Sequence, residues 1–352
     1  MNTVELIEAL KEIVKEKGID EDFIFQALEA ALVSAYKKNY GTSQNVKVAI
    51  NRTTGEIHVY AQKKVVEEIT NDLLEVSLED AKKINPIYEL EDIVDFEVTP
   101  KDFGRVAAQT AKQSVVQKIR EAEREILFKE FVEKENDIIS GMVQKIERIK
   151  DTSKYNVIVE LGKIETILPP PEQIPNEDYN QGDRLKFYIT EVKRTSKGPN
   201  IVISRTHPGL VKRLFELEVP EIFNGVVEIK SIAREAGSRT KIAVYTRDEN
   251  VDPTGACVGP KGVRVQNVVN ELKGEKIDIV KWSKDPAEYI ANALSPAKVV
   301  SVEINEEERN AKVVVPDYQL SLAIGKEGQN ARLAAKLTGW KIDIKSESQA
   351  KV

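Results

Sequence analysis

The sequence has 352 residues, of which 41% are hydrophobic and 31% are charged. This composition supports roughly two to four folded domains of about 100–200 residues each, and it excludes a wholly disordered chain. Cys257 is the single cysteine, and His58 and His207 are the only histidines, which excludes a disulfide framework and a zinc site of Cys and His ligands. We therefore expect a soluble, cytoplasmic, multi-domain protein that holds no metal and no cofactor.

The net charge of −6 is distributed unevenly along the chain. Residues 1–134 carry 19 basic and 26 acidic side chains, whereas residues 135–352 carry 33 and 32. An acidic surface repels RNA phosphates, so we expect the first third to bind a protein, with folding and solubility alone as the alternative role. The remainder can present local basic surfaces. The acidic start is not a signal peptide, and no uncharged run approaches the about 18 residues of a membrane span, so no membrane contact is expected.

Two helices are predicted at the start of the chain. Asn2 and Glu5 match a helix cap with a reciprocal carboxylate, and the apolar residues that follow have helical spacing up to Gly18. A second helix is predicted over 20–40, with Asp20 as its cap.

Strands and one long helix follow. Alternating apolar residues at 46–50 and 57–61 predict a hairpin, and 86–100 predict a strand and a turn. From 102 to about 135, apolar residues step by three and four without a breaker, which predicts a helix of roughly 50 Å that links two parts of the molecule. We therefore expect residues 1–135 to form an α/β N-terminal domain, called the head, with a long connecting helix.

Residues 136–205 predict a small barrel of short strands, called the barrel below. Its strands are expected at 138–145, 155–161, 164–168, 185–192 and 200–204. Such barrels bind single strands through exposed aromatic and basic residues, although structural packing is an alternative role for each residue here. The candidates are Lys186, Tyr188, Lys193 and Arg194, with Tyr155 and Phe187 beside them. Because Phe187 and Tyr188 are adjacent, we expect one of the two to face the core.

The C-terminal part of the chain contains an internal repeat. Gly259–Gly262 recurs as Gly325–Gly328, 66 positions later, and Lys276–Ile279 recurs as Lys341–Ile344, 65 positions later. These glycine segments are called the first loop and the second loop. Each copy predicts the order helix, strand, strand, helix, loop, helix, strand. The helices and strands before the loops are expected at 208–217, 225–232 and 239–246, and at 286–294, 298–305 and 311–316.

The two loops suit contact with a sugar-phosphate chain. Glycine lacks a Cβ, so the backbone can approach phosphates closely, and the helix that follows offers free N–H groups. KH modules hold about four single-stranded nucleotides in this way. The candidate RNA-binding residues are Gly259, Pro260, Lys261, Gly262 and Arg264, and Gly325, Lys326, Glu327, Gly328, Gln329, Asn330 and Arg332. Solvated helix surface is the alternative for Arg264 and Arg332, and the carboxylate of Glu327 repels phosphate.

The sequence offers little catalytic chemistry. It has neither a P-loop nor a dinucleotide-binding glycine motif, and neither histidine has an evident nucleophile partner. His58 is expected at an outward strand position, and Cys257 is expected to be a buried apolar residue. The carboxylates of 306–308 are expected in a solvated turn. We therefore expect no enzymatic activity.

Long strings of residues carry a family resemblance. The chain resembles the NusA family of bacterial transcription termination/antitermination factors over essentially its full length. The strings lie at 204–206, 214–215, 218–222, 225–230, 233–241, 252–259, 292–297 and 322–325.

This resemblance implies a multi-domain α+β protein with four domains. They are an RNA-polymerase-binding head at 1–135, an OB barrel of the S-one type at 136–205, and two tandem type II KH domains at 206–283 and 284–352. We call the last two the first repeat and the second repeat.

The resemblance also implies partners: RNA polymerase, nascent single-stranded RNA and other elongation or antitermination factors, bound by a monomer that modulates pausing, intrinsic termination and antitermination. Some members add acidic C-terminal repeats. This sequence ends at Val352, just after the second KH domain, so contacts through such repeats are not expected.

Two other classes of protein combine similar modules. Phosphorolytic nucleases pair KH and barrel domains, but after large catalytic domains with acidic metal ligands, whereas here the barrel precedes the repeats. Ribosome-assembly factors also contain KH domains. RNA turnover in the presence of metal and phosphate distinguishes the first class, and sedimentation with ribosomal subunits the second.

Overall fold

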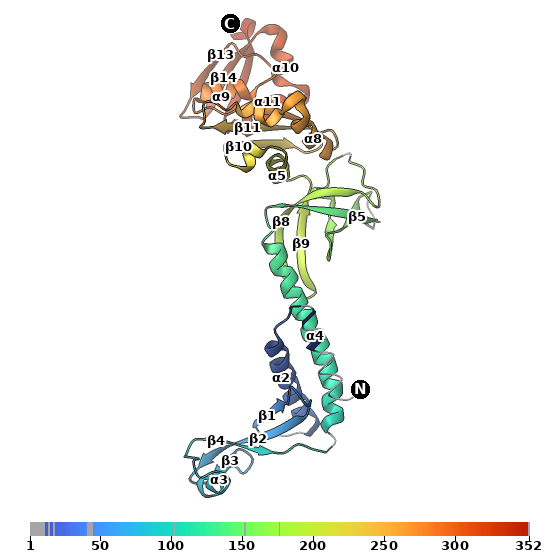
Figure 1. Ribbon diagram of the computed structural model, residues 1–352. Coiled ribbons are helices and arrows are strands. Elements are labelled where there is room, and N and C mark those ends of the chain that lie inside the picture. The colour runs from blue at the N-terminus through green and yellow to red at the C-terminus, as the bar shows by residue number, and fades with distance from the viewer. Residues whose placement is uncertain are drawn as a thin grey trace. The chain divides into compact units, whose positions relative to one another are not determined.

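The computed structural model describes residues 11–12, 15–16, 18–40, 45–101, 103–150, 153–175 and 177–350 (Figure 1). The chain forms two compact units, one up to Lys129 and one from Glu130 onward. The predicted helix before Gly18, with its cap at Asn2 and Glu5, falls mostly outside the described residues. Among the described residues, no helix has the length and apolar character to cross a membrane.

The first unit combines helices with one four-stranded sheet. Strands β1, β2 and β3 are neighbours in that order, and β4 also pairs with β2. The predicted hairpin is β1 and β2, which pair antiparallel from Ile50 opposite Ile57 to Asn45 opposite Gln62. The elements are α2 (Glu21–Tyr40), β1 (Asn45–Ile50), β2 (Ile57–Val66), β3 (Glu75–Ser77), α3 (Leu78–Ile84), β4 (Ile93–Glu97) and α4 (Phe103–Val132).

Helix α3 and strand β3 are absent from the sequence prediction. Their signal is a helix cap: Ser77 Oγ accepts a hydrogen bond from the backbone N–H of Asp80 at 3.1 Å. The short helix contributes one fully buried residue, Ala81, to a small core with Val65 and Val94. A helix of two turns with a single buried residue leaves almost no periodic pattern for sequence analysis to detect.

The main core of the first unit lies between α2, the hairpin and α4. Phe25, Leu32, Val59 and Phe103 are fully or almost fully buried in it. Helix α4 has 30 residues and therefore extends about 45 Å at 1.5 Å per residue. The boundary between the two units falls inside it, after Lys129. The prediction of one long uninterrupted helix in this region is confirmed.

The second unit begins with a five-stranded barrel. Its strands are β5 (Ile138–Arg148), β6 (Tyr155–Glu160), β7 (Glu165–Leu168), β8 (Arg184–Thr195) and β9 (Gly198–Ser204), with the 3-10 turn η1 (Pro170–Glu172) after β7. The strand order is β7-β6-β5-β8-β9. Thr166 on β7 donates its hydroxyl to the carbonyl of Ile201 on β9 at 2.5 Å, which joins the two ends of the sheet. All five strands were predicted.

The two repeats have the predicted order of elements. The first contains α5 (Pro208–Glu218), α6 (Pro220–Phe223), β10 (Val227–Glu235), β11 (Arg239–Thr246), α7 (Pro253–Val258), η2 (Pro260–Gly262), α8 (Val263–Glu271) and β12 (Lys276–Lys281). The second contains α9 (Pro286–Ala293), β13 (Ser301–Asn305), β14 (Asn310–Val315), η3 (Asp317–Gln319), α10 (Leu320–Ile324), η4 (Lys326–Gly328), α11 (Gln329–Thr338), β15 (Lys341–Ser346) and α12 (Glu347–Ala350).

Each repeat has a three-stranded mixed sheet of the same design. The first two strands pair antiparallel, and the third strand pairs parallel to the second. The repeats share a core, because Ala233, Ala243 and Val280 of the first pack in one cluster with Leu333 and Ala334 of the second. The barrel is joined in the same way, because its Tyr188 lies in the core cluster of the first repeat.

The barrel and the first repeat are also joined by the buried guanidinium of Arg205, whose side chain is 0% exposed. It makes two hydrogen bonds to the carboxylate of Glu177, of 2.8 and 2.5 Å. It also donates to the carbonyl of Lys186 on β8 at 2.7 Å and to the carbonyl of Glu271 at the end of α8 at 3.0 Å. Glu271 in turn accepts the backbone N–H of Lys186. One side chain therefore links barrel and repeat.

Replacing Arg205 by Ala is expected to destabilise the second unit by about 3–5 kcal/mol, because the buried carboxylate of Glu177 loses its charge partner. Trp282 and Trp340 are the two tryptophans and both lie in the repeats, so their fluorescence during urea unfolding reports on this unit. The double variant Arg205→Met, Glu177→Leu, which replaces both charges by apolar side chains, is expected to recover part of the stability that Arg205→Ala loses. Lys193→Ala, which removes the exposed 2.9 Å pair with Glu191, is the control and should leave the midpoint unchanged. An unchanged midpoint for Arg205→Ala would contradict the assignment.

Cys257 is 0% exposed in the core of the first repeat, as the sequence predicted, and burial raises the pKa of its thiol to about 12. The thiolate is the reactive form, so at pH 8 the native protein is expected to react with iodoacetamide at least about 1,000-fold more slowly than the urea-unfolded protein. Mass spectrometry of timed samples measures both rates. Rapid labelling of the native protein would show that the thiol is accessible.

Candidate nucleic-acid interface

The two glycine loops have the same backbone conformation. Gly259 and Gly325 have φ/ψ of 72°/173° and 77°/173°. The third loop residues, Lys261 and Glu327, lie in the left-handed region at 54°/21° and 55°/26°. Gly262 and Gly328 follow at 75°/13° and 74°/12°. The repeat in sequence is therefore also a repeat in geometry, and Lys261 and Glu327 occupy equivalent positions.

The first glycine of each loop is required for steric reasons. A Cβ at Gly259 would lie 2.6 Å from Cγ of Arg264, and a Cβ at Gly325 would lie 2.8 Å from the backbone nitrogen of Asn330. The combination of positive φ with extended ψ is also one that only glycine adopts readily. The loop thus folds back onto the first turn of the next helix.

The last glycine of each loop faces open space. No atom lies within 4 Å of a Cβ at Gly262, and only the Arg332 guanidinium, at 3.9 Å, approaches a Cβ at Gly328. Helices α8 and α11 begin there without a side-chain cap. Their first N–H groups and the positive end of the helix dipole are therefore available to an anion, which can approach the backbone closely.

Arg264 and Asn330 stabilise the loops by hydrogen bonds to backbone carbonyls that precede each loop. One guanidinium nitrogen of Arg264 donates to the carbonyl of Ala256 at 2.6 Å and to Glu221 at 2.9 Å. Asn330 is 4% exposed, and its amide nitrogen donates to the carbonyls of Leu294 and Ala323 at 3.0 Å. Both residues were predicted to bind RNA. The structure gives each of them a supporting role in loop geometry.

Gln329 and Arg332 connect the second loop to the first repeat. Gln329 donates to Glu235 at 2.9 Å and to the hydroxyl of Ser238 at 2.7 Å. Arg332 donates to Glu235 at 2.6 and 3.2 Å and to the carbonyl of Glu327 at 3.1 Å. The Arg332 hydrogen bond lowers the pKa of Glu235, which therefore stays ionised. Arg332 is an exposed residue of α11, as the alternative of solvated helix surface has it, and its guanidinium is also tied to Glu235.

The candidates in the barrel separate into two groups. Tyr188 is 7% exposed and stacks on His207 with ring centroids 4.6 Å apart, so it has no face to offer a base. The expectation that one of Phe187 and Tyr188 faces the core is confirmed for Phe187, which is 0% exposed and lies beside Val159 in the barrel. Tyr188 is buried as well, but it packs in the core cluster of the first repeat. Lys186 lies beside Glu271 at the junction with the first repeat.

Lys193 and Arg194 are the exposed members of the barrel set. Both lie near the end of β8, in a strand that pairs with β9 at Asn200 and Pro199. Lys193 pairs with Glu191 at 2.9 Å across a solvated surface. Such a pair is weak in water, so Lys193 can exchange this partner for a phosphate at little cost.

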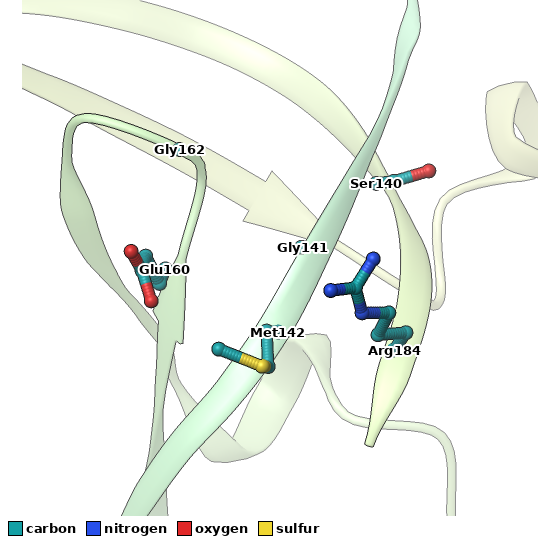
Figure 2. A pocket seen from close by; sticks show the side chains of 6 residues that line it. All are labelled: Ser140, Gly141, Met142, Glu160, Gly162 and Arg184. Carbon is teal, nitrogen blue, oxygen red and sulfur yellow. The ribbon is translucent and has the colours of Figure 1, made fainter. Parts of the chain in front are cut away.

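The barrel also has a surface hollow of about 230 Å³ (Figure 2). It is lined by Ser140, Gly141, Met142, Glu160, Gly162 and Arg184. Figure 2 shows the Arg184 guanidinium beside Gly141, with the Glu160 carboxylate on the opposite side. Gly141 is necessary because a Cβ would lie 2.6 Å from Val159. With one cation facing one carboxylate, the hollow offers no net attraction for a phosphate chain.

The remaining polar groups of the prediction have structural partners. His58 is partly buried on β2, and its ring contacts the carboxylate of Glu97 at 2.8 Å. His207 caps α5 by accepting the N–H of Gly209, and burial lowers its pKa. Among the described residues, no group of three or more His, Cys, Asp or Glu side chains is arranged to hold a metal ion.

Glu235, Arg239 and Lys276 lie at the second loop although they belong to the first repeat, and sequence reasoning did not select them as site residues. The hydrogen bond from Arg332 to Glu235 joins residues 97 positions apart. No local spacing pattern connects such positions. The repeat itself carried the only available signal, because it implied that two similar modules follow each other directly.

Four family models match the chain in order. They are the NusA N-terminal domain at residues 5–125, the S1 RNA binding domain at 133–204, the NusA-like first KH domain at 205–282 and the NusA-like second KH domain at 286–352. The chain is also similar to the solution structure of the N-terminal domain of NusA from B. subtilis, with 56% identity over 35% of this chain and 98% of that chain and a TM-score of 0.32.

Two relatives that match nearly the whole chain are named NusA. The transcription termination/antitermination protein NusA of Halalkalibacterium halodurans is 62% identical over 346 residues, which cover 98% of this chain and 89% of the relative. The protein of that name from Bacillus subtilis is 61% identical over 347 residues, 99% of this chain and 92% of the relative. The chain therefore belongs to the NusA family, with an N-terminal domain, an S1 barrel and two KH domains.

Proposed function

We propose that the protein is a transcription elongation factor that binds RNA polymerase and nascent single-stranded RNA, and so modulates pausing, intrinsic termination and antitermination. The observation that carries the RNA part is the pair of glycine loops with one backbone geometry, each open at its last glycine and each followed by an uncapped helix. Family membership supports the role in transcription.

The loops suit single-stranded RNA better than a small anion. Lys261 and Lys326 are exposed on the loops, and Leu322 and Ile324 next to the second loop are 47% and 37% exposed. Phosphates are held by backbone N–H groups and lysines, while apolar side chains beside them accommodate bases. Because backbone contacts carry no sequence information, affinity should depend strongly on salt and weakly on sequence.

The head is the part of the chain that suits a protein partner. Residues 1–134 have seven more acidic than basic side chains, which disfavours RNA. Ile84, Ile87 and Ile93 are 56%, 80% and 60% exposed within a short stretch of it. An acidic domain with exposed apolar side chains fits a partner protein, for which we propose RNA polymerase. The protein is proposed to act as a cytoplasmic monomer that has no enzymatic activity.

Replacing Lys261 and Lys326 together by Asp is expected to weaken RNA binding by at least about tenfold, because each change reverses a charge beside the phosphate chain. Filter binding with labelled single-stranded RNA measures the affinity, and co-purification with RNA polymerase should be unaffected. Equal affinity of variant and parent for RNA would refute the role of the loops. Turnover of the RNA in the presence of metal and phosphate would instead support a nuclease.

Cross-linking the full chain to a stalled elongation complex tests the whole proposal. Residues of the head are expected to cross-link to polymerase, and residues of the two loops to the emerging RNA. Sedimentation with ribosomal subunits but not with polymerase would favour the ribosome-assembly alternative and would overturn the assignment of the head.

A further inference from the structure

A cavity of about 340 Å³ lies where the two repeats meet, at the second loop. One wall comes from the first repeat, with Ser238, Arg239 and Lys276, and the other comes from the second repeat. The lining of the second wall is Pro296, Leu322, Gly325, Lys326, Gln329 and Asn330. The loop that should contact RNA is thus also one side of a space built by two modules.

The cavity lining carries three cations and no carboxylate: Arg239, Lys276 and Lys326. Arg239 donates to Asp278 at 3.2 Å, but Asp278 is shared with the buried Lys241 at 3.1 Å. Among the described residues, the side-chain nitrogens of Lys276 and Lys326 have no hydrogen-bond or ion-pair partner. A surplus of positive charge therefore remains around this space.

Two carboxylates, Glu235 and Glu327, belong to residues that contact or adjoin the lining of the cavity. Glu235 bonds to the lining residue Gln329, and it also pairs with the cation of Arg332. Glu327 stands next to Lys326 in the loop and is exposed. No ion pair joins its carboxylate to a cation among the described residues, and it opposes phosphate binding at the second loop.

A comparison of equivalent positions in the two loops shows that the second loop has less positive charge than the first. Lys261 of the first loop corresponds to Glu327 of the second, as their left-handed backbone angles show. The second loop has Lys326 one position earlier, so its own charge sums to zero. The first repeat places Lys276 and Arg239 against this loop, where they restore the positive charge that the loop itself lacks.

The wall formed by the first repeat is held firmly against the loop. Gln329 bonds to Ser238 and Glu235, and Arg332 bonds to Glu235, so three hydrogen bonds to the Glu235 carboxylate and one to the Ser238 hydroxyl connect the first helical turns of α11 to the end of β10 and the turn that follows it. Asn330 supports this arrangement from inside the second repeat, because its amide nitrogen donates to the carbonyls of Leu294 and Ala323.

We propose that the second RNA-binding loop is a composite site, in which Lys276 of the first repeat and Lys326 of the second bind the same phosphate of an RNA strand. The proposal rests on the proposed RNA-binding function and adds a residue to it that neither loop contains. Arg239 assists as a neighbouring cation. The second repeat thus needs the first repeat for full RNA affinity.

The test is a double-variant cycle in the full chain. The probe is a 5′-fluorescein-labelled, unstructured 12-nucleotide RNA, and fluorescence anisotropy gives its affinity over a range of salt concentrations. Lys276→Gln, Lys326→Gln and Lys261→Gln are measured alone, and Lys276→Gln is then combined with each of the others. Lys284→Gln is the charge-matched control, because Lys284 is exposed and lies beyond the opposite end of β12 from Lys276.

Lys276→Gln is expected to weaken binding about fivefold and to reduce the slope of log affinity against log salt by about 0.7, the value for one phosphate contact on a single strand. Lys276→Gln and Lys326→Gln should combine to clearly less than the product of their separate effects, because they share a phosphate. Lys276→Gln and Lys261→Gln should multiply. Lys284→Gln should bind as the parent does.

Two results overturn the composite site. One is a Lys276→Gln variant that binds like the Lys284→Gln control while Lys326→Gln is weakened, and the proposed RNA-binding function then still stands. The other is full multiplication of the Lys276 and Lys326 effects, which would place the two lysines on separate phosphates. Parent-like binding by both Lys261→Gln and Lys326→Gln would instead refute the proposed function of the loops.

Discussion

The second unit depends on a guanidinium that solvent does not reach. Arg205 lies at the end of the barrel and makes hydrogen bonds to Glu177, to the carbonyl of Lys186 and to the end of α8. A buried ion pair of this kind contributes little net stability, since desolvation offsets the attraction. What it provides is geometry, because its planar fork accepts only one arrangement of the groups around it. The barrel and the first repeat are therefore held in one register.

The same principle governs the junction between the two repeats. Glu235 receives Gln329 and Arg332 from the helix that follows the second loop, and Lys241 extends from the first repeat to the carbonyl of Ser295. Burial lowers the pKa of Lys241, while Asp278 at 3.1 Å offsets part of that effect. Apolar contacts between the sheet of the first repeat and α11 stabilise the junction, but the hydrophobic effect does not fix an orientation. The directional bonds then decide which residues face the cavity.

The sequence predicted those features whose causes are local. The helices and strands of the repeats follow from periodicity, and the two loops follow from paired glycines at matching positions. The short helix α3 was not predicted, because a single buried residue leaves no helical periodicity in the sequence. The roles of Arg264 and Asn330 could not be predicted, because a polar residue in the first turn after such a loop can face a ligand or turn back onto the backbone. Both side chains turn back onto the backbone. Arg264 and Asn330 lie so close to Gly259 and Gly325 that a Cβ at either glycine would clash with them.

The near-neutral charge of residues 135–352 does not describe their surface, because several of their carboxylates are paired with arginines and lysines. Glu177 and Glu275 are buried with Arg205 and Arg234. Asp278 and Glu235 are likewise occupied by cations at the junction between the repeats. These acidic groups neutralise arginines and lysines of the protein itself, which reduces their repulsion of an RNA strand. Among the described residues, Lys261, Lys276 and Lys326 have no ion-pair partner, so positive charge is left over at the loops and the cavity of a chain whose net charge is negative.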